Sequence, residues 1–302
     1  MLKRTRTLFD SQKMNVQRSR MAMAVFVVTA LSLQCHQAAV DPGSTLAAMP
    51  DTTPASAVVT SAAALTGSDV DLARRDPLAY IQKCLDHYRR SVHDYVCQFE
   101  KQEQIDGKLL APQVAEVRFR ENPYSVDMTF VENVRECKRA LYVDGAWTNA
   151  DGEAMVWAKP GGAILRALVP RIQQPVHGKR ARAASRRTID QFGFERTLEV
   201  ILKFSEKALA AGELDFAFVG EGTIDGRPTF VFERRLPYNG DEAYYPDRLL
   251  VLHIDREWKL PTAVYSYADT QGRDLLGSYV FSDVQLNQGL TRSDFDPDKI
   301  DF

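Results

Sequence analysis

Apolar and polar residues alternate in short segments along most of the chain from residue 97 onward. For example, Ala115, Val117 and Phe119 alternate with polar neighbours, and side chains two residues apart lie on the same face of a strand. Turn-forming residues separate the segments, as Asp106-Gly107 does between the first two. This order of strands and short turns predicts a meandering antiparallel sheet with one dry face and one wet face.

The alternation also indicates where the strands lie. Two are expected within 97–121, and the others within 124–131, 138–145, 153–159, 213–223, 224–235, 248–255, 259–269 and 277–286.

Two segments repeat apolar residues at helical spacing instead. The first begins at Pro77, which suits a helix N-terminus, and its apolar stripe consists of Leu78, Ile81, Leu85 and Tyr88. The second covers 194–211, and Gly212 supplies its stop. Each apolar stripe needs a surface to cover, so we expect both helices to pack on the sheet.

The first 39 residues have the pattern of an export signal. A basic segment with Lys13, Arg18 and Arg20 precedes the apolar run 21–33. The run has 13 residues, fewer than the roughly 20 that cross a bilayer as a helix, so a cleaved signal is favoured over a retained anchor. We therefore expect a periplasmic or cell-envelope protein that contacts the membrane only through a retained anchor or an attached lipid.

Two processing routes compete at the end of this signal. Ala30 and Ser32 have the spacing that a signal peptidase reads, whereas acylation of Cys35 would give a lipoprotein. Gln34 stands before Cys35 where a small residue is usual, which favours ordinary cleavage. Met14 lies just before the basic segment and would give a signal of more ordinary length as the start residue.

Composition indicates a globular domain behind a tether. Residues 40–74 are rich in Ala, Ser, Thr and Pro, which predicts a disordered linker between the export region at 1–39 and a single domain at 75–302. The 45% hydrophobic content is ample for a core. With 38 basic and 40 acidic residues the net charge is −2, so no global field attracts nucleic acid or anionic membranes.

The cysteines and histidines allow two interpretations. Cys84, Cys97 and Cys137 lie in the expected domain, so at most one internal disulfide can form there, for example between Cys84 and Cys97. These two cysteines, with His87 and His93, are also the kind of donors that bind zinc. Their spacing is not a standard zinc signature and exported thiols tend to oxidise, so we expect no metal site.

Charged residues crowd the first expected strand. Glu100, Lys101 and Glu103 belong either to an active site or to the wet face of the sheet. Glu100 and Lys101 point to opposite faces of a strand, charged residues on strands are usually solvated, and no nucleophile motif or phosphate-binding loop accompanies them. We expect these charges to form the exposed side of the first hairpin, and we expect no enzymatic activity and no cofactor.

One segment, 177–187, concentrates positive charge between the expected strands and the second helix. Its basic residues are Lys179, Arg180, Arg182, Arg186 and Arg187. The segment is either a solvated loop or a surface that contacts anionic lipid head groups or an acidic envelope polymer. Nucleic acid is disfavoured because no stacking aromatic residues accompany the patch.

The ordered motifs of the domain resemble a bacterial family known as domain of unknown function 1571. The resemblance rests on YVCQFEKQEQIDGKLLAPQVAEVRFRENPYSVDM at 95–128, the LYVDG that follows, SRRTIDQFG at 185–193 and FSDVQLNQGLTRSDFDPD at 281–298. Asp127 departs from the family pattern, in which an apolar or aromatic residue is more usual. The leading helix, the long meander and the tail at 287–295 are also similar to the LolA and RseB superfamily, which implies an α+β fold: an open, strongly curved antiparallel half-barrel covered by helices.

This second resemblance implies an apolar concavity in which a lipid, an acyl chain or a lipoprotein binds. The dry-face residues that would line it are Phe119, Met128, Phe130, Leu141, Trp157, Phe216, Phe218, Phe230 and Phe232. The alternative is a structural or sensing module whose concavity is filled by its own side chains and whose wet face binds another envelope protein. A continuous cavity under the helices favours the first interpretation, and a packed interior favours the second.

Overall fold

The computed structural model describes residues 62–162, 167–300 and 302. In this part of the chain 12 strands form one sheet. The strands are β1 (Asp94–Ile105), β2 (Lys108–Leu109), β3 (Gln113–Arg120), β4 (Ser125–Glu132), β5 (Cys137–Val143), β6 (Met155–Pro160), β7 (Ile172–Pro175), β8 (Asp215–Ile224), β9 (Arg227–Arg235), β10 (Leu249–Asp255), β11 (Pro261–Tyr267) and β12 (Leu275–Leu286). The helices are α1 (Ala62–Arg75), α2 (Pro77–Ser91), α4 (Lys179–Ala184) and α5 (Phe194–Ala211), with the 3-10 turns η1 (Ile189–Gln191) and η2 (Arg292–Phe295).

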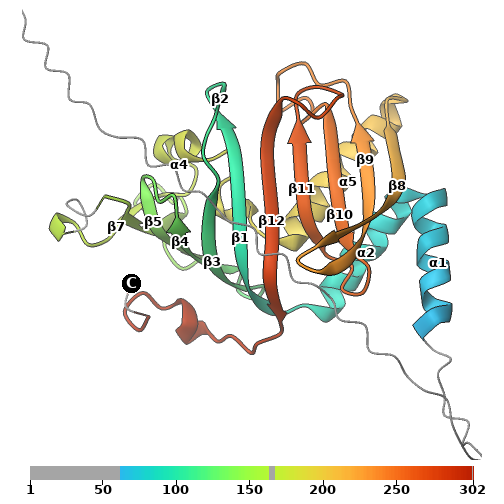
Figure 1. Cartoon of the computed structure of the whole chain (residues 1–302). Coiled ribbons are helices and arrows are strands. Elements are labelled where there is room, and N and C mark those ends of the chain that lie inside the picture. The colour runs from blue at the N-terminus through green and yellow to red at the C-terminus, as the bar shows by residue number, and fades with distance from the viewer. Residues whose placement is uncertain (1–61, 163–166, 301) are drawn as a thin grey trace, which may run out of the picture. The chain divides into compact units, whose positions relative to one another are not determined.

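The sheet is an open antiparallel meander, as the sequence predicts. Its strand order is β7-β6-β5-β4-β3-β1-β12-β11-β10-β9-β8, and β2 pairs with the end of β1. The last strand in the chain, β12, pairs with the first long strand, β1, and so joins the two halves of the sheet (Figure 1). Within the described ranges β7 and β8 remain at opposite edges of the strand order, so the sheet does not close into a barrel.

Tight turns set the register of the hairpins. Asp106 and Gly107 have φ of 50° and 74°, and Asp225 and Gly226 have φ of 50° and 71°. Two successive positive φ values define the turn whose twist matches that of antiparallel strands, and Asp-Gly tolerates both. The predicted hairpins β1–β2 and β8–β9 are confirmed.

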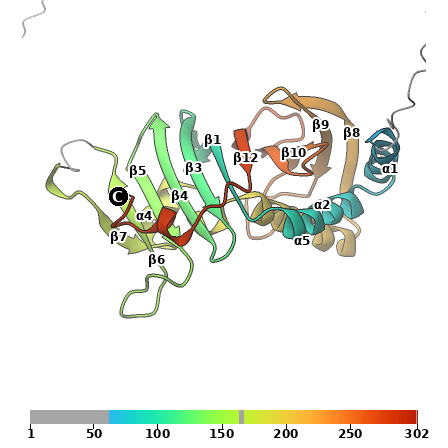
Figure 2. The same ribbon diagram turned by 90° about the horizontal axis from the view of Figure 1, so that it is seen from below.

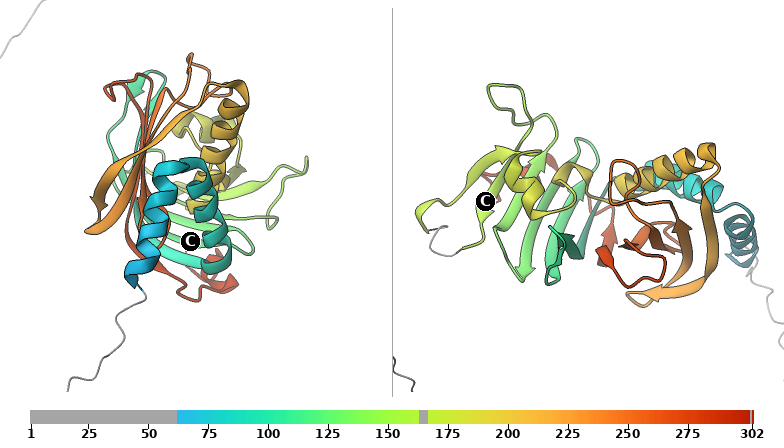
Figure 3. Two further views of the ribbon diagram at one scale, coloured as in Figure 1. Left: turned by 90° about the vertical axis from the view of Figure 1, so that its right-hand side faces the viewer. Right: turned by 90° about the horizontal axis from the view of Figure 1, so that it is seen from above.

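Two long helices cover one face of the sheet, which we call the inner face. Figures 2 and 3 show α2 and α5 side by side along the part of the sheet that contains β8–β12. Ile81 of α2 and Leu198 of α5 are buried in one core with Phe232 and Leu252 of the strands. Because both apolar stripes are satisfied by the same surface, the two predicted helices and their packing on the sheet are confirmed.

A second core of aromatic rings joins the start of α5 to the centre of the sheet. Tyr95 of β1 stacks on Phe119 of β3 at 4.6 Å between ring centroids, and Phe194 of α5 lies 4.5 Å from Phe281 of β12. Gly193 precedes the helix with φ of 103°, and a β-carbon there would lie 2.8 Å from the Tyr95 hydroxyl oxygen. A glycine is therefore required by both the backbone conformation and the close approach.

The expected linker is partly helical. Residues 62–74, assigned to a disordered linker from composition, belong to α1, and Ala73 is fully buried against the core under α2. Asp69 is also buried and forms ion pairs with Lys83 at 2.6 Å and Lys259 at 2.9 Å. The prediction of disorder is wrong for this stretch because a short alanine-rich helix needs only a few buried contacts to be held. The remainder of 40–74, the export region 1–39 and Cys35 lie outside the described residues.

The outer face of the sheet, opposite α2 and α5, carries the C-terminal tail. The Asp127 carboxylate accepts two hydrogen bonds of 2.7 Å from Arg139 and pairs with Arg118 at 2.9 Å. The Arg139 guanidinium lies 5.0 Å from the centroid of the Phe302 ring. Asp127 therefore points away from the inner face, and its departure from the family pattern leaves the inner lining unaffected.

Among the described helices, none has the length and apolar character needed to span a membrane.

Glu121 gives the helix–sheet junction a predicted pH dependence. Burial raises the pKa of its carboxyl to about 6, the nearby Glu195 charge adds to the shift, and a hydrogen bond from the Tyr88 hydroxyl opposes it. The folded state therefore keeps a proton that the unfolded chain, with a carboxyl pKa of 4.5, has lost. This contribution to stability is complete below pH 4.5 and is lost as the pH rises through about 6.

A Glu121→Gln variant tests this contribution because its amide stays neutral. Its stability relative to wild type is expected to improve by about 1 kcal/mol between about pH 4 and pH 8, after allowance for solvent screening. Urea unfolding at the two pH values measures the difference. An unchanged difference would show that Glu121 titrates normally in the folded protein.

Candidate functional site

A cavity of about 240 Å³ lies between the inner face of the sheet and the segment 174–201 that crosses it. One wall is apolar and consists of Phe99, Met128, Phe130, Ala140, Val156, Val176, Ile189, Phe192, Val200, Leu250, Val264 and Phe281. The other wall carries polar and charged side chains from β1, β12 and the segment around α4. The cavity is therefore amphipathic, and β1 contributes to both parts of the lining through Phe99 on the one hand and Lys101 and Glu103 on the other.

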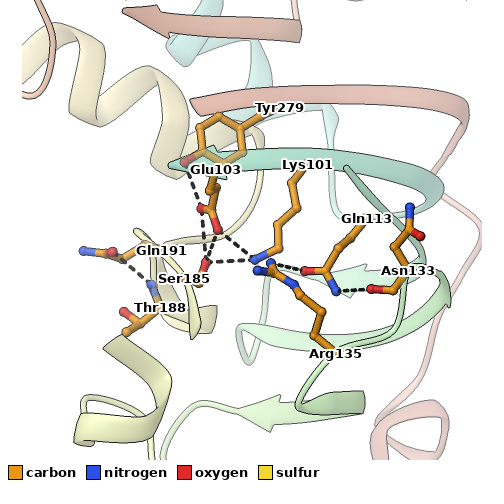
Figure 4. A network of polar contacts seen from close by, with 9 residues as sticks. All are labelled: Lys101, Glu103, Gln113, Asn133, Arg135, Ser185, Thr188, Gln191 and Tyr279. Atoms are coloured by element: carbon orange, nitrogen blue, oxygen red, sulfur yellow. Dashed lines mark hydrogen bonds and ion pairs between the residues drawn. The ribbon is translucent and has the colours of Figure 1, made fainter. Parts of the chain in front are cut away.

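The polar wall is built around a buried carboxylate (Figure 4). Glu103 of β1 accepts hydrogen bonds from the Lys101 ammonium at 3.0 Å, from the Tyr279 hydroxyl at 3.0 Å and from the Ser185 hydroxyl at 2.9 Å. Lys101 also donates to the Ser185 oxygen at 2.9 Å. Lys101 and Glu103 are 8% and 1% exposed, so the ion pair is shielded from water.

The expectation that the charges of the first hairpin are exposed is wrong for two of the three residues. Glu100 is exposed, but Lys101 and Glu103 follow Phe99 at intervals of two along β1 and share its inner face. The usual rule of solvated strand charges fails here because each charge has a buried partner of opposite sign. In the sequence, the spacing of two and four residues from the apolar Phe99 was the signal that Lys101 and Glu103 lie on the inner face.

The protonation states of this cluster suit binding rather than proton transfer. Burial by itself raises the pKa of the Glu103 carboxyl, but the Lys101 charge and the hydrogen bonds from Lys101, Ser185 and Tyr279 outweigh it and leave the pKa below its usual value. Burial and the Glu103 charge raise the pKa of the Tyr279 phenol, which stays a donor. A carboxylate with a lowered pKa and three donors is a weak base for activating Ser185.

A second polar branch adjoins this cluster. Arg135 donates through Nη2 to the side-chain oxygen of Gln113, and the Gln113 amide donates to the Asn133 carbonyl at 3.0 Å. Arg135 and Arg187 both line the cavity. Neither forms an ion pair with any acidic residue that the structure describes.

The predicted lining residues divide into three groups. Met128 and Phe130 line the cavity. Phe119, Phe230 and Phe232 are at most 1% exposed and belong to the packed cores, where Phe216 and Phe218 contact Phe232. Leu141 and Trp157 lie on the outer face, packed with the C-terminal tail.

The prediction that Leu141 and Trp157 lie on the dry inner side of β5 and β6 is wrong. Their neighbours Ala140 and Val156 are the ones that face the cavity. Alternation fixes which residues of one strand share a face, but the match between strands depends on register. Leu141 pairs with the outer-face residue Asp127 of β4 and with Trp157 of β6, which places both on the outer face.

The basic segment is also split by the fold. Lys179, Arg180 and Arg182 are exposed on and around α4, and for them a role in binding anionic surfaces stays a prediction. Arg186 does not belong to that surface, because its side chain is 5% exposed and pairs with Glu242 at 2.8 Å. Arg187 lines the cavity instead.

The cysteines do not converge. Cys84 is buried with α1 and α2 in one core, Cys97 is buried in the aromatic core, and Cys137 lines the cavity. All three are free thiols, and burial raises the pKa of Cys84 to about 12 and that of Cys137 to about 11. The proposed pairing of Cys84 with Cys97 is absent, and no group of three or more metal-binding side chains occurs in the described parts of the chain.

The family described as "Protein of unknown function (DUF1571)" matches residues 92–302. The chain belongs to this family. The DUF1571 region begins at the end of α2 and contains the whole sheet together with the lining of the cavity. A search of the curated proteins finds no match to the sequence.

Several solved structures share features of the DUF1571 fold at low sequence identity. One is the Pseudomonas aeruginosa MucA/MucB complex, at 16% identity over 73% of this chain and 60% of that chain with a TM-score of 0.42. Another is the Mycobacterium tuberculosis lipoprotein LppX, at 15% identity over 73% of this chain and 100% of that chain with a TM-score of 0.40. A LolA superfamily protein from Nitrosomonas europaea matches at 10% identity over 73% and 99% of the two chains, with a TM-score of 0.25. This chain spans about three fifths of the MucB chain that it matches.

Proposed function

We propose that this protein is a non-enzymatic binding protein of the cell envelope that holds the apolar part of a lipid, an acyl chain or a lipid-modified protein in the inner-face cavity. The observation that carries the proposal is the cavity itself, which is walled on one side by apolar side chains from β1, β4, β6 and β12. A sensing module with a filled interior would leave no such space. Export is proposed from the basic and apolar pattern of residues 13–33.

The size of the cavity limits what it holds. A volume of about 240 Å³ exceeds the roughly 150 Å³ that suffices for a benzene ring and is below the range of about 300–1,000 Å³ typical of pockets that enclose a drug-sized ligand. We therefore propose that the cavity holds one end of an acyl chain, while the rest of the ligand lies outside it.

The chemistry of the polar wall supports binding over catalysis. The Ser185 hydroxyl contacts a candidate base in the cavity lining, but the Glu103 carboxylate accepts from three donors and Lys101 is paired with Glu103. These bonds fix the wall in one arrangement, so a ligand meets preorganised polar groups and pays little to order them.

Filling the cavity is expected to weaken the binding of an apolar probe strongly. Ala140→Trp places an indole in the space that Ala140 borders, and the affinity for the neutral fluorophore N-phenylnaphthylamine is expected to fall at least tenfold, about 1.4 kcal/mol. Val131→Trp is the matched control, because Val131 is 41% exposed on β4 and does not line the cavity. Fluorescence titration measures both affinities.

Two further readouts make this test decisive. Ala140→Leu fills less space and is expected to weaken binding by an intermediate factor, and circular dichroism checks that each variant is folded. Equal affinities in wild type and folded Ala140→Trp, or no probe binding by wild type, would contradict the proposed function.

A further inference from the structure

Most positive charges that line the cavity have an acidic partner. The pairs are Lys101 with Glu103 at 3.0 Å, Arg234 with Asp247 at 3.1 Å and Arg196 with Glu199 at 2.8 Å. Arg135 and Arg187 remain, and neither pairs with a carboxylate of the residues described by the structure. Among the described residues, the lining therefore includes two arginines without an ion-pair partner and one carboxylate without one, the exposed Glu136, which leaves an excess of positive charge.

Arg135 has more hydrogen-bonding capacity than its surroundings use. Its Nη2 donates to Gln113, while its Nε is buried and has no hydrogen-bond partner among the residues that are described. A guanidinium has five N–H donors in a planar fork, and a buried donor without a partner is unfavourable. An acceptor supplied by a ligand would satisfy these donors.

Arg187 approaches the same polar wall from the segment that crosses the inner face. It lies two residues after Ser185, whose hydroxyl donates to Glu103, and close enough to Tyr279 for its charge to act on the phenol. Figure 4 shows Arg135 beside the Glu103 cluster, where it donates to the side-chain oxygen of Gln113. The two arginines without an ion-pair partner in the described part of the chain thus line the same cavity as the Glu103 cluster.

This arrangement selects ligands by charge. Guanidinium groups bind carboxylate or phosphate oxygens in a two-point fashion, and they repel cationic head groups. An anion with a single apolar chain matches both walls, because the chain would contact Met128 and Phe130 and the anion would reach the arginines.

We infer that the cavity is specific for anionic amphiphiles and that Arg135 and Arg187 bind the carboxylate or phosphate group of the ligand. The inference rests on the proposed function and adds the chemical class of the ligand to it. The charged group sets the preference among ligands, and the apolar wall supplies affinity that neutral chains share.

Competition against N-phenylnaphthylamine tests the inference with the full chain. Decanoate, decanol and decyltrimethylammonium below their micelle concentrations share one chain and differ in head group, and inorganic phosphate supplies an anion without a chain. Decanoate is expected to displace the fluorophore at a concentration at least tenfold lower than decanol, and decyltrimethylammonium is expected to be weakest. Added salt is expected to weaken displacement by decanoate, whose head group is attracted by charge, and to leave displacement by decanol unchanged.

Variants identify the residues responsible. Arg135→Gln and Arg187→Gln are each expected to remove most of the preference for decanoate and to leave the affinity for decanol within about twofold of wild type. Arg135→Lys keeps the charge and is expected to retain part of the preference. Arg180→Gln is the matched control, because Arg180 is exposed and does not line the cavity, and it is expected to leave the preference unchanged.

Each contrary outcome has a distinct meaning. Equal displacement by decanoate and decanol would overturn the inference and leave the proposed function standing, whereas no displacement by any chain would overturn both. If phosphate displaced the fluorophore at the same concentration as decanoate, the ligand would be a free anion and not an amphiphile, and the inference would be overturned. If Arg135→Gln lost affinity for decanol as much as for decanoate, the role of Arg135 would be to pack the cavity wall, and this outcome would also overturn the inference.

Discussion

Replacing Asp247 with alanine is expected to lower the free energy of unfolding by about 3–5 kcal/mol, because it leaves a buried guanidinium without its counter-ion. The Arg234 and Asp247 side chains are 1% and 2% exposed, and Arg234 also donates to the Ile201 carbonyl at 3.1 Å. Arg234 thus connects β9 to α5, and both side chains of the pair are almost completely buried. Urea unfolding at about pH 7 measures the loss.

The control for Asp247→Ala is an ion pair of the same kind at the surface. Glu257 is 80% exposed and shares Arg227 with the buried Asp255, so Glu257→Ala is expected to cost less than about 1 kcal/mol. Losses of similar size in the two variants would show that Arg234 finds another partner, or water, when Asp247 is removed.

Glu103→Gln is expected to destabilise the protein by about 3 kcal/mol, whereas Glu100→Gln is expected to change stability by less than about 0.5 kcal/mol. A glutamine at position 103 can still accept from Ser185 and Tyr279, but it leaves the ammonium of the nearly buried Lys101 side chain without a charge partner. Glu100 lies on the opposite face of the same strand and is exposed. The two substitutions are chemically identical, so their difference isolates the effect of burial.

The pH dependence of this difference has a defined sign. The pKa of the Glu103 carboxyl lies below 4.5 in the folded state, so its contribution to stability is present above pH 4.5 and is lost as the pH falls through the folded-state value. Urea unfolding at about pH 7 and about pH 3 measures the loss of the Glu103→Gln effect. A Glu103→Gln effect that is the same at both pH values would mean that Glu103 is not the charged partner of Lys101.

The local features of the fold follow directly from the sequence. The helix at 194–211 has the predicted limits because Gly212 adopts φ of 71° and ends it, and Asp106-Gly107 makes the predicted hairpin turn. These features depend on residues that are close in the chain. Periodicity and turn chemistry therefore suffice to predict them.

The candidate site depends on contacts that local patterns do not encode. Ser185 meets Glu103 from 82 positions away, and Tyr279 meets it from 176 positions away. Only the pairing of β1 with β12 and the path of the covering segment bring these groups together. The spacing of Lys101 and Glu103 from Phe99 indicates that both face inward with it, but this local pattern does not contain the distant partners that make their burial tolerable.

The central position of β12 has a consequence for how the chain acquires its structure. The β1–β12 ladder, in which Tyr95 pairs with Leu286 and Glu103 with Gly277, is the junction between the two halves of the sheet. Closing so long a loop carries a high entropic cost before any of its contacts form, which slows folding. Each half can collapse early around its own hairpins, but the cavity, which is lined by strands of both halves, exists only after the last strand has docked, so ligand binding reports completion of the fold.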